Sequence, residues 1–106
     1  GQKQRVALAR ALIKKPEILI LDDAFSHLDS ETEEEILENI RGQLRQTTTL
    51  IISHRLSAVR GADRIIVLDA GQIIEQGNHA SLVRVGGVYA SLFQNQLLAR
   101  EMEILL

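Results

Sequence analysis

The feature that most constrains the fold is a short apolar run, ILIL at residues 18–21, which ends in two adjacent aspartates, Asp22 and Asp23. Apolar residues at consecutive positions are typical of a strand that is covered on both faces, as in a parallel sheet. In open α/β sheets, ligands bind in the crevice beyond the carboxyl ends of the strands. The run therefore predicts a strand that carries two carboxylates to a ligand-binding edge.

Helical and β-branched segments surround this strand. Residues 2–15 have apolar side chains at helical spacing, and Pro16 ends that segment. Ser30 followed by Glu33 has the spacing of a capping box, which predicts the start of a second helix. Residues 48–53 are β-branched and apolar and predict a second strand. Strands that alternate with helices indicate the α/β class with a parallel sheet.

The second half of the chain has its own turn signals. Residues 64–68 and 72–76 flank the turn sequence DAG and predict a β-hairpin. Asn78 is suited to cap a short helix, and residues 88–106 read as a terminal helix after two glycines. The two central strands alone would leave open sheet edges, so we expect the chain to be part of a larger domain.

Composition narrows the function classes. The chain has 106 residues, enough for one small domain, and an apolar fraction of 45% that argues against disorder. A net charge of −2 gives no electrostatic reason to expect nucleic-acid binding. The absence of cysteine excludes disulfides and thiolate chemistry. No apolar run approaches the roughly 20 residues of a membrane helix.

Four polar features occur along the chain in an order that indicates a ligand-binding site. Gly1-Gln2 begins a helix, where free backbone N–H groups suit a phosphate. Asp22 can hold Mg²⁺, usually through water. A polar turn spans residues 26–29, and His54 follows the second strand at the same sheet edge. A paired aspartate is more often a turn or a cap, and a lone histidine is more often structural, but the four features in this order indicate a nucleotide site.

These motifs resemble the C-terminal half of an ATP-binding cassette (ABC) nucleotide-binding domain. GQKQRVALARAL is similar to the end of the signature motif LSGGQ and its helix, ILILD to the Walker B strand, SHLD to the D-loop and IISHR to the H-loop. The sequence from Ala62 to Gln96 resembles the exporter branch of the family. The resemblance implies a partial P-loop NTPase (RecA-like) parallel-sheet core with part of the helical signature subdomain. It also implies that residues 1–106 are the C-terminal portion of one ATPase domain, with Walker A and the membrane domain absent.

The resemblance also implies roles for individual residues. Asp22 would hold Mg²⁺ through water, and His54 would contact the γ-phosphate of ATP as the switch histidine. Gly1 and Gln2 would close over the ATP bound to a partner domain, and Asp29 would lie at the dimer interface. The implied cofactors are ATP and Mg²⁺. The implied partners are a second nucleotide-binding domain and the transmembrane domains, with no nucleic acid, and the implied location is the cytoplasmic face of the cell membrane, with this segment itself soluble.

Two residues depart from the family pattern. Asp23 stands where the family has its catalytic glutamate, and it is shorter by one methylene, or roughly 1 Å of reach, which can cost about a hundredfold in rate. Phe25 replaces the usual threonine with a large apolar ring. The combination resembles the degenerate half of a heterodimeric exporter, which would bind ATP and hydrolyse it slowly. Because no G-x-x-x-x-G-K-S/T sequence occurs, we expect the isolated chain to be inactive.

Other interpretations compete with this one. The chain could belong to a homodimeric exporter that uses aspartate as its base, or to a soluble ABC ATPase of DNA repair or translation. The exporter-like tail and the lack of a basic patch argue against the soluble ATPase. A structural α/β fragment that associates through an open sheet is the remaining alternative. His79 is expected to be structural, His27 to be incidental, and Tyr89 and Phe93 to anchor the last helix in the core.

Overall fold

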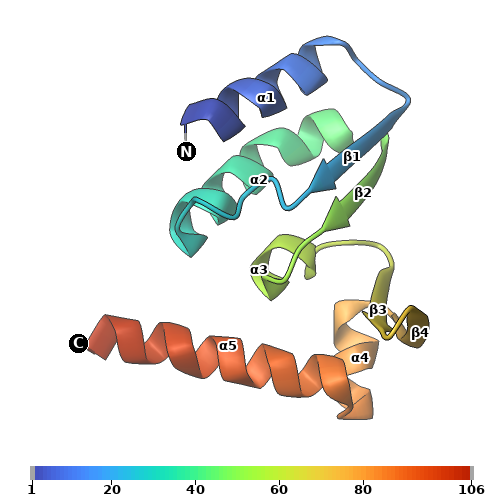
Figure 1. Cartoon of the computed structure of the whole chain (residues 1–106), viewed down its shortest axis with the longest axis vertical. Helices are drawn as coiled ribbons and strands as arrows, with labels where there is room; N and C mark the ends of the chain where they lie inside the picture. The colour runs from blue at the N-terminus through green and yellow to red at the C-terminus, as the bar shows by residue number, and fades with distance from the viewer. Residues whose placement is uncertain (1, 106) are drawn as a thin grey trace. The chain divides into compact units, whose positions relative to one another are not determined.

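A computed structural model describes residues 2–105 and shows helices alternating with strands (Figure 1). The chain divides into two compact units, residues 1–58 and 59–106. The elements are α1 (Gln2–Ile13), β1 (Ile18–Asp22), α2 (Ser30–Leu44), β2 (Thr48–Ile52), α3 (Leu56–Val59), β3 (Ile65–Asp69), β4 (Gln72–Gly77), α4 (His79–Val85) and α5 (Val88–Leu105). The predicted α/β class is confirmed.

A parallel pair of strands forms the centre of the first unit. β1 pairs with β2 in a register that runs from Ile18 opposite Thr48 to Asp22 opposite Ile52. Leu19 and Leu21 are each 4% exposed, whereas Ile18 and Ile20 are 66% and 60% exposed. The expectation of a strand covered on both faces therefore fails among the described residues, because they supply packing partners for one face only.

The start of α2 corrects the predicted capping box. The N-cap is Asp29, not Ser30, and its carboxylate accepts the N–H of Thr32 at 2.7 Å. Aspartate caps helices as well as serine does, so the helix begins one residue earlier than the predicted box requires. The side chain of Glu33 is committed elsewhere, to Arg55. Leu37 and Ile40 lie on the buried face of α2.

The second unit begins with the predicted hairpin. β3 and β4 pair antiparallel, with Ile65 opposite Gly77 and Asp69 opposite Gln72. The two loop residues, Ala70 and Gly71, have φ values of +49° and +75°. Positive φ at both positions is the pattern of a type I′ turn, whose twist matches that of the strands. The sequence DAG therefore specifies this turn locally.

Two polar caps fix the helices that follow. Asn78 accepts the N–H of Ser81 at 2.8 Å, and Ser81 Oγ accepts the N–H of Asn78 at 3.0 Å, which completes a capping box. The carboxylate of Glu75, on β4, accepts the N–H groups of Val88 and Tyr89 at 2.7 and 3.0 Å. An anion at a helix N-terminus also interacts favourably with the helix dipole. Both helix starts of this unit are therefore satisfied by side chains.

Tyr89 anchors α5 in the second unit. It is 1% exposed, and its hydroxyl lies 2.7 Å from Nδ1 of His79. The His79 ring contacts Tyr89 and Phe93 edge to face, and the Arg60 guanidinium lies 5.8 Å from the centre of the Phe93 ring. His79 is thus a packing and hydrogen-bonding residue at the start of α4, which agrees with its structural interpretation.

His79 should make stability depend on pH. Burial, and secondarily the Arg60 charge, lower the pKa of His79 below the ordinary value of 6.5. The unfolded chain therefore binds more protons than the folded chain between the two pKa values. We expect stability to be complete above pH 6.5 and to fall as the pH drops toward the folded pKa.

The check is denaturant unfolding of the purified protein at about pH 7.5 and about pH 5.5. The variant His79→Gln, which keeps a hydrogen-bonding group and cannot titrate, should lose less stability over this range. Equal losses in the two proteins would show that His79 is not the titrating group.

Candidate functional site

The carboxyl ends of β1 and β2 lie at the same sheet edge. The parallel register places Asp22 opposite Ile52, and the N–H of Asp23 donates to the carbonyl of Ile52 at 2.8 Å, which extends the ladder by one bond. Asp22 and Asp23 leave one strand and His54 follows the other, and all three are exposed. The structure thus brings the two predicted strand ends together.

The chain turns sharply at Asp23. This residue has φ +52°, in the left-handed region that few residues other than glycine adopt and that aspartate tolerates better than most. The N–H of Leu28 donates to the carbonyl of Phe25 at 3.0 Å, and these two side chains are 8% and 4% exposed. Phe25, where the family resemblance leads one to expect threonine, therefore anchors the loop in the core.

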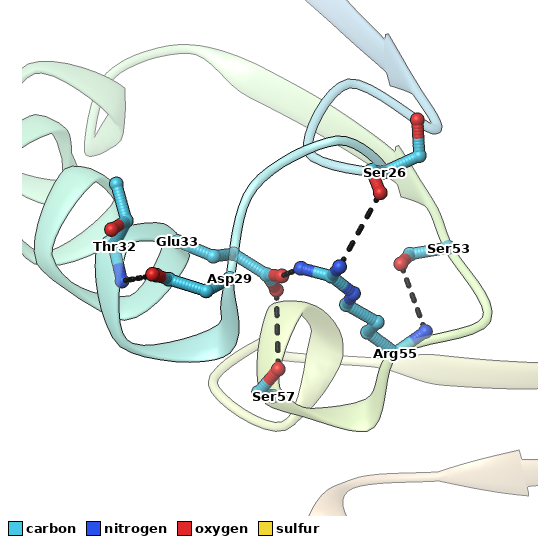
Figure 2. Close-up of polar contacts among 7 residues, drawn as sticks. All are labelled: Ser26, Asp29, Thr32, Glu33, Ser53, Arg55 and Ser57. Carbon is cyan, nitrogen blue, oxygen red and sulfur yellow. Dashed lines mark hydrogen bonds and ion pairs between the residues drawn. The ribbon is translucent and has the colours of Figure 1, made fainter. Parts of the chain in front are cut away.

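A partly buried ion pair, together with a hydrogen bond to Ser26, connects this loop and α2 to the segment after β2 (Figure 2). Arg55 Nη1 lies 2.7 Å from Glu33 Oε2, and Arg55 Nη2 donates to the carbonyl of Ser26 at 3.3 Å. Ser57 Oγ donates to Glu33 Oε1 at 3.2 Å, so both oxygens of Glu33 are satisfied. The side chain of Glu33 is fully buried and that of Arg55 is 32% exposed. The pair joins the first turn of α2 to the residue that follows His54.

Sequence reasoning missed this pair. Glu33 had a sufficient local explanation in the predicted capping box, and Arg55 is adjacent to the more conspicuous His54. The two residues are 22 positions apart, on a helix and a loop, and no periodicity connects them. The one available signal was that Glu33 lies on the apolar side of α2, where a buried carboxylate needs a cationic partner.

The carboxylate at the end of β1 suits a Mg²⁺ ion whose other ligands are nucleotide phosphates and water. Mg²⁺ in phosphate-transfer sites is held by one or two carboxylates together with substrate phosphates and water. Asp22 offers one exposed carboxylate at the strand end. Within residues 2–105, no group of three or more histidine or acidic side chains is placed to hold a metal by itself. The residues present therefore fit a metal that shares its ligands with phosphate.

The remaining predicted site residues are placed as follows. Asp29 is the N-cap of α2, and its neighbour along the loop, Ser26, contacts Arg55. His27 is exposed on the same loop. Gly1 lies outside the described residues. Gln2 begins α1, and its side chain is not described.

Comparisons with known proteins point in one direction. A family model described as "ABC transporter" matches residues 1–26. The chain is 55% identical over 96 residues to the ATP-dependent lipid A-core flippase of Bordetella avium, which covers 91% of this chain and 16% of that protein. It is 54% identical over 101 residues to the ABC-type oligopeptide transporter ABCB9 of Mus musculus, which covers 95% of this chain and 13% of that protein. The chain thus spans about one sixth or less of these relatives.

A solved structure agrees with the sequence relatives. The structure of a bacterial Atm1-family ABC exporter with ATP bound matches with a TM-score of 0.83 and 47% identity, over 90% of this chain and 17% of that one. In the part of this chain that the structure describes, no helix is both long and apolar enough to cross a membrane. The chain belongs to the ABC transporter family and corresponds to a segment of the nucleotide-binding domain of its exporter-type members.

Proposed function

We propose that the chain is the C-terminal part of an ATP-hydrolysing domain that powers an ABC exporter. The observation that carries this proposal is the parallel β1–β2 edge, where Asp22 ends one strand, Asp23 directly follows it, and His54 follows the other strand. In this assignment α1 is the signature helix, β1 is Walker B, residues 26–29 are the D-loop and residues 51–55 are the H-loop. Without a Walker A sequence in residues 1–106, the chain would act only within the full transporter.

Each residue of the edge then has a separate task. Asp22 would hold Mg²⁺ through water, and the bound metal would supply positive charge against the ATP phosphates. His54 contacts the γ-phosphate from the neighbouring strand end. Gly1 and Gln2 approach the ATP that is bound to the second nucleotide-binding domain. Asp29, which caps α2, lies at the interface with that domain.

Asp23 is the weak member of this site. A general base must reach the water that it activates, and aspartate is one methylene too short where glutamate is expected. Its left-handed backbone is compatible with the short side chain, and the buried Phe25 ring keeps the loop fixed. This supports a site that binds ATP and hydrolyses it slowly, as in the degenerate half of a heterodimeric exporter. A homodimeric exporter that uses aspartate as its base is the second candidate.

The partners and the location follow from this role. Two nucleotide-binding domains would associate when Mg-ATP is bound, and the movement would be passed to transmembrane domains. The domain would then lie at the cytoplasmic face of the cell membrane. The named transporters among the relatives support this proposal, and the net charge of −2 gives no support for a nucleic-acid partner.

The test removes the proposed magnesium ligand. In the full transporter, Asp22→Asn should lower Mg²⁺-dependent photolabelling of this domain by azido-ATP by about tenfold, because the amide carries no charge for the metal. Asp69→Asn is the matched control, since Asp69 is also an exposed aspartate at the end of a strand but lies in the hairpin. Labelling that is equal in Asp22→Asn and the unmodified protein would refute the assignment.

A further inference from the structure

We propose that Glu33 and Arg55 are positioning residues, whose ion pair holds the His54 segment and the loop of residues 23–29 in one fixed arrangement. The inference rests on the proposed function, because it concerns the alignment of groups at the nucleotide edge. Neither residue is assigned a contact with ATP or Mg²⁺. Their effect would be exerted through the two backbone segments that they join (Figure 2).

Arg55 contacts α2, the loop of residues 23–29 and Ser53. Its side chain bonds the Glu33 carboxylate at 2.7 Å and the Ser26 carbonyl at 3.3 Å, and its own N–H donates to Ser53 Oγ at 3.0 Å. The planar guanidinium presents its donors in a fixed geometry, so two bonds determine its orientation. Since Arg55 directly follows His54, fixing Arg55 limits where the His54 backbone can lie.

Both the backbone and the side chain of Glu33 are held by hydrogen bonds. Its N–H donates to the carbonyl of Asp29 at 3.0 Å in the first turn of α2, so its position is set by the cap. Its carboxylate is fully buried, with one oxygen on Arg55 and the other on Ser57. An exposed ion pair would define little, but the buried Glu33 carboxylate has both oxygens hydrogen-bonded, which leaves its side chain little freedom. A chain of contacts therefore connects Asp29 to His54: Asp29 is hydrogen-bonded to Glu33, Glu33 is paired with Arg55, and Arg55 directly follows His54.

If the ion pair had only a structural role, its replacement would have a different effect on turnover. A buried ion pair can be replaced by apolar side chains of similar volume with little loss of stability, or with a gain. If Glu33 and Arg55 only filled space, such a replacement would preserve hydrolysis as well as folding. If they position the two segments, it would preserve folding and reduce turnover.

The experiment uses the full transporter with the double variant Glu33→Met/Arg55→Met. We expect a thermal unfolding midpoint close to that of the unmodified protein. At this domain's own site we expect a KM for ATP within about twofold and a site-resolved kcat lowered by about tenfold or more. Ser57→Ala is the matched control, because it removes one bond to Glu33 and leaves the Arg55 contacts in place, and its kcat should be nearly unchanged. An unchanged kcat in the double variant would overturn the inference.

If the double variant does not fold, the conservative variant Arg55→Lys tests the same inference. Arg55→Lys keeps the charge, but one ammonium cannot reproduce the geometry of both bonds. We expect its kcat to fall severalfold with KM retained, and an unchanged kcat would overturn the inference alone. An unmodified transporter that neither binds nor hydrolyses Mg-ATP would overturn the proposed function and this inference with it.

Discussion

Asp23→Glu is expected to raise the rate of ATP hydrolysis at this domain's site by up to about a hundredfold in the full transporter. The added methylene extends the carboxylate by roughly 1 Å toward the water that a general base must reach. The strand end needs no other change, because the N–H of Asp23 is already held by the Ile52 carbonyl at 2.8 Å. Site-resolved hydrolysis, measured in the domain that carries the substitution, is the required readout.

Two control variants separate length from basicity. Asp23→Gln has the length of glutamate and no basic carboxylate, so it should not raise the rate. Asp23→Asn keeps the length of aspartate but removes its charge, and it should lower the rate. Glutamate tolerates the left-handed backbone at φ +52° less well than aspartate does, so Asp23→Glu should also be slightly less stable. An Asp23→Glu rate no higher than that of Asp23→Gln would refute the short-base explanation.

Tyr89→Ala is expected to have the largest effect on stability, a loss of about 3–5 kcal/mol in the second unit. Tyr89 is 1% exposed, so its removal leaves a cavity beneath α5. The change also removes the hydroxyl that lies 2.7 Å from His79 Nδ1. Hydrogen exchange at the amides of α4 and α5 measures the loss of local stability directly.

Tyr89→Phe is the matched control for this prediction. It keeps the ring and its edge-to-face contact with His79, and it removes only the hydroxyl. We expect a loss of about 1 kcal/mol, which is the usual net value of one hydrogen bond. If Tyr89→Phe and Tyr89→Ala destabilised the unit equally, packing of the ring would not be the main contribution.

Features with local causes could be predicted from the sequence. The turn at Ala70-Gly71 and the cap at Asn78 each depend on residues within a few positions of one another. The pairing of β1 with β2 followed from two apolar runs joined by a helix, and the structure confirms it. These predictions succeeded because backbone conformation and capping are decided by near neighbours.

Features that depend on distant residues could not be predicted. Ser30 and Asp29 are both good caps, and the choice between them depends on Glu33, whose carboxylate is bound by Arg55. The cap that Glu75 provides for α5 likewise joins β4 to a helix start through two backbone N–H groups. The open face of β1 has a similar cause, since an apolar run reveals a capacity for burial and not which face is covered.

The most direct test of the central claim follows the fate of ATP bound at this domain's own site. That claim is that Asp22 holds the metal while Asp23 is too short to serve as an efficient base. The full transporter is allowed to turn over with Mg-ATP, and the nucleotide held at this site is then identified. We expect this nucleotide to remain mostly ATP through many turnovers. Conversion to ADP as fast as in an ABC site with the catalytic glutamate would contradict it.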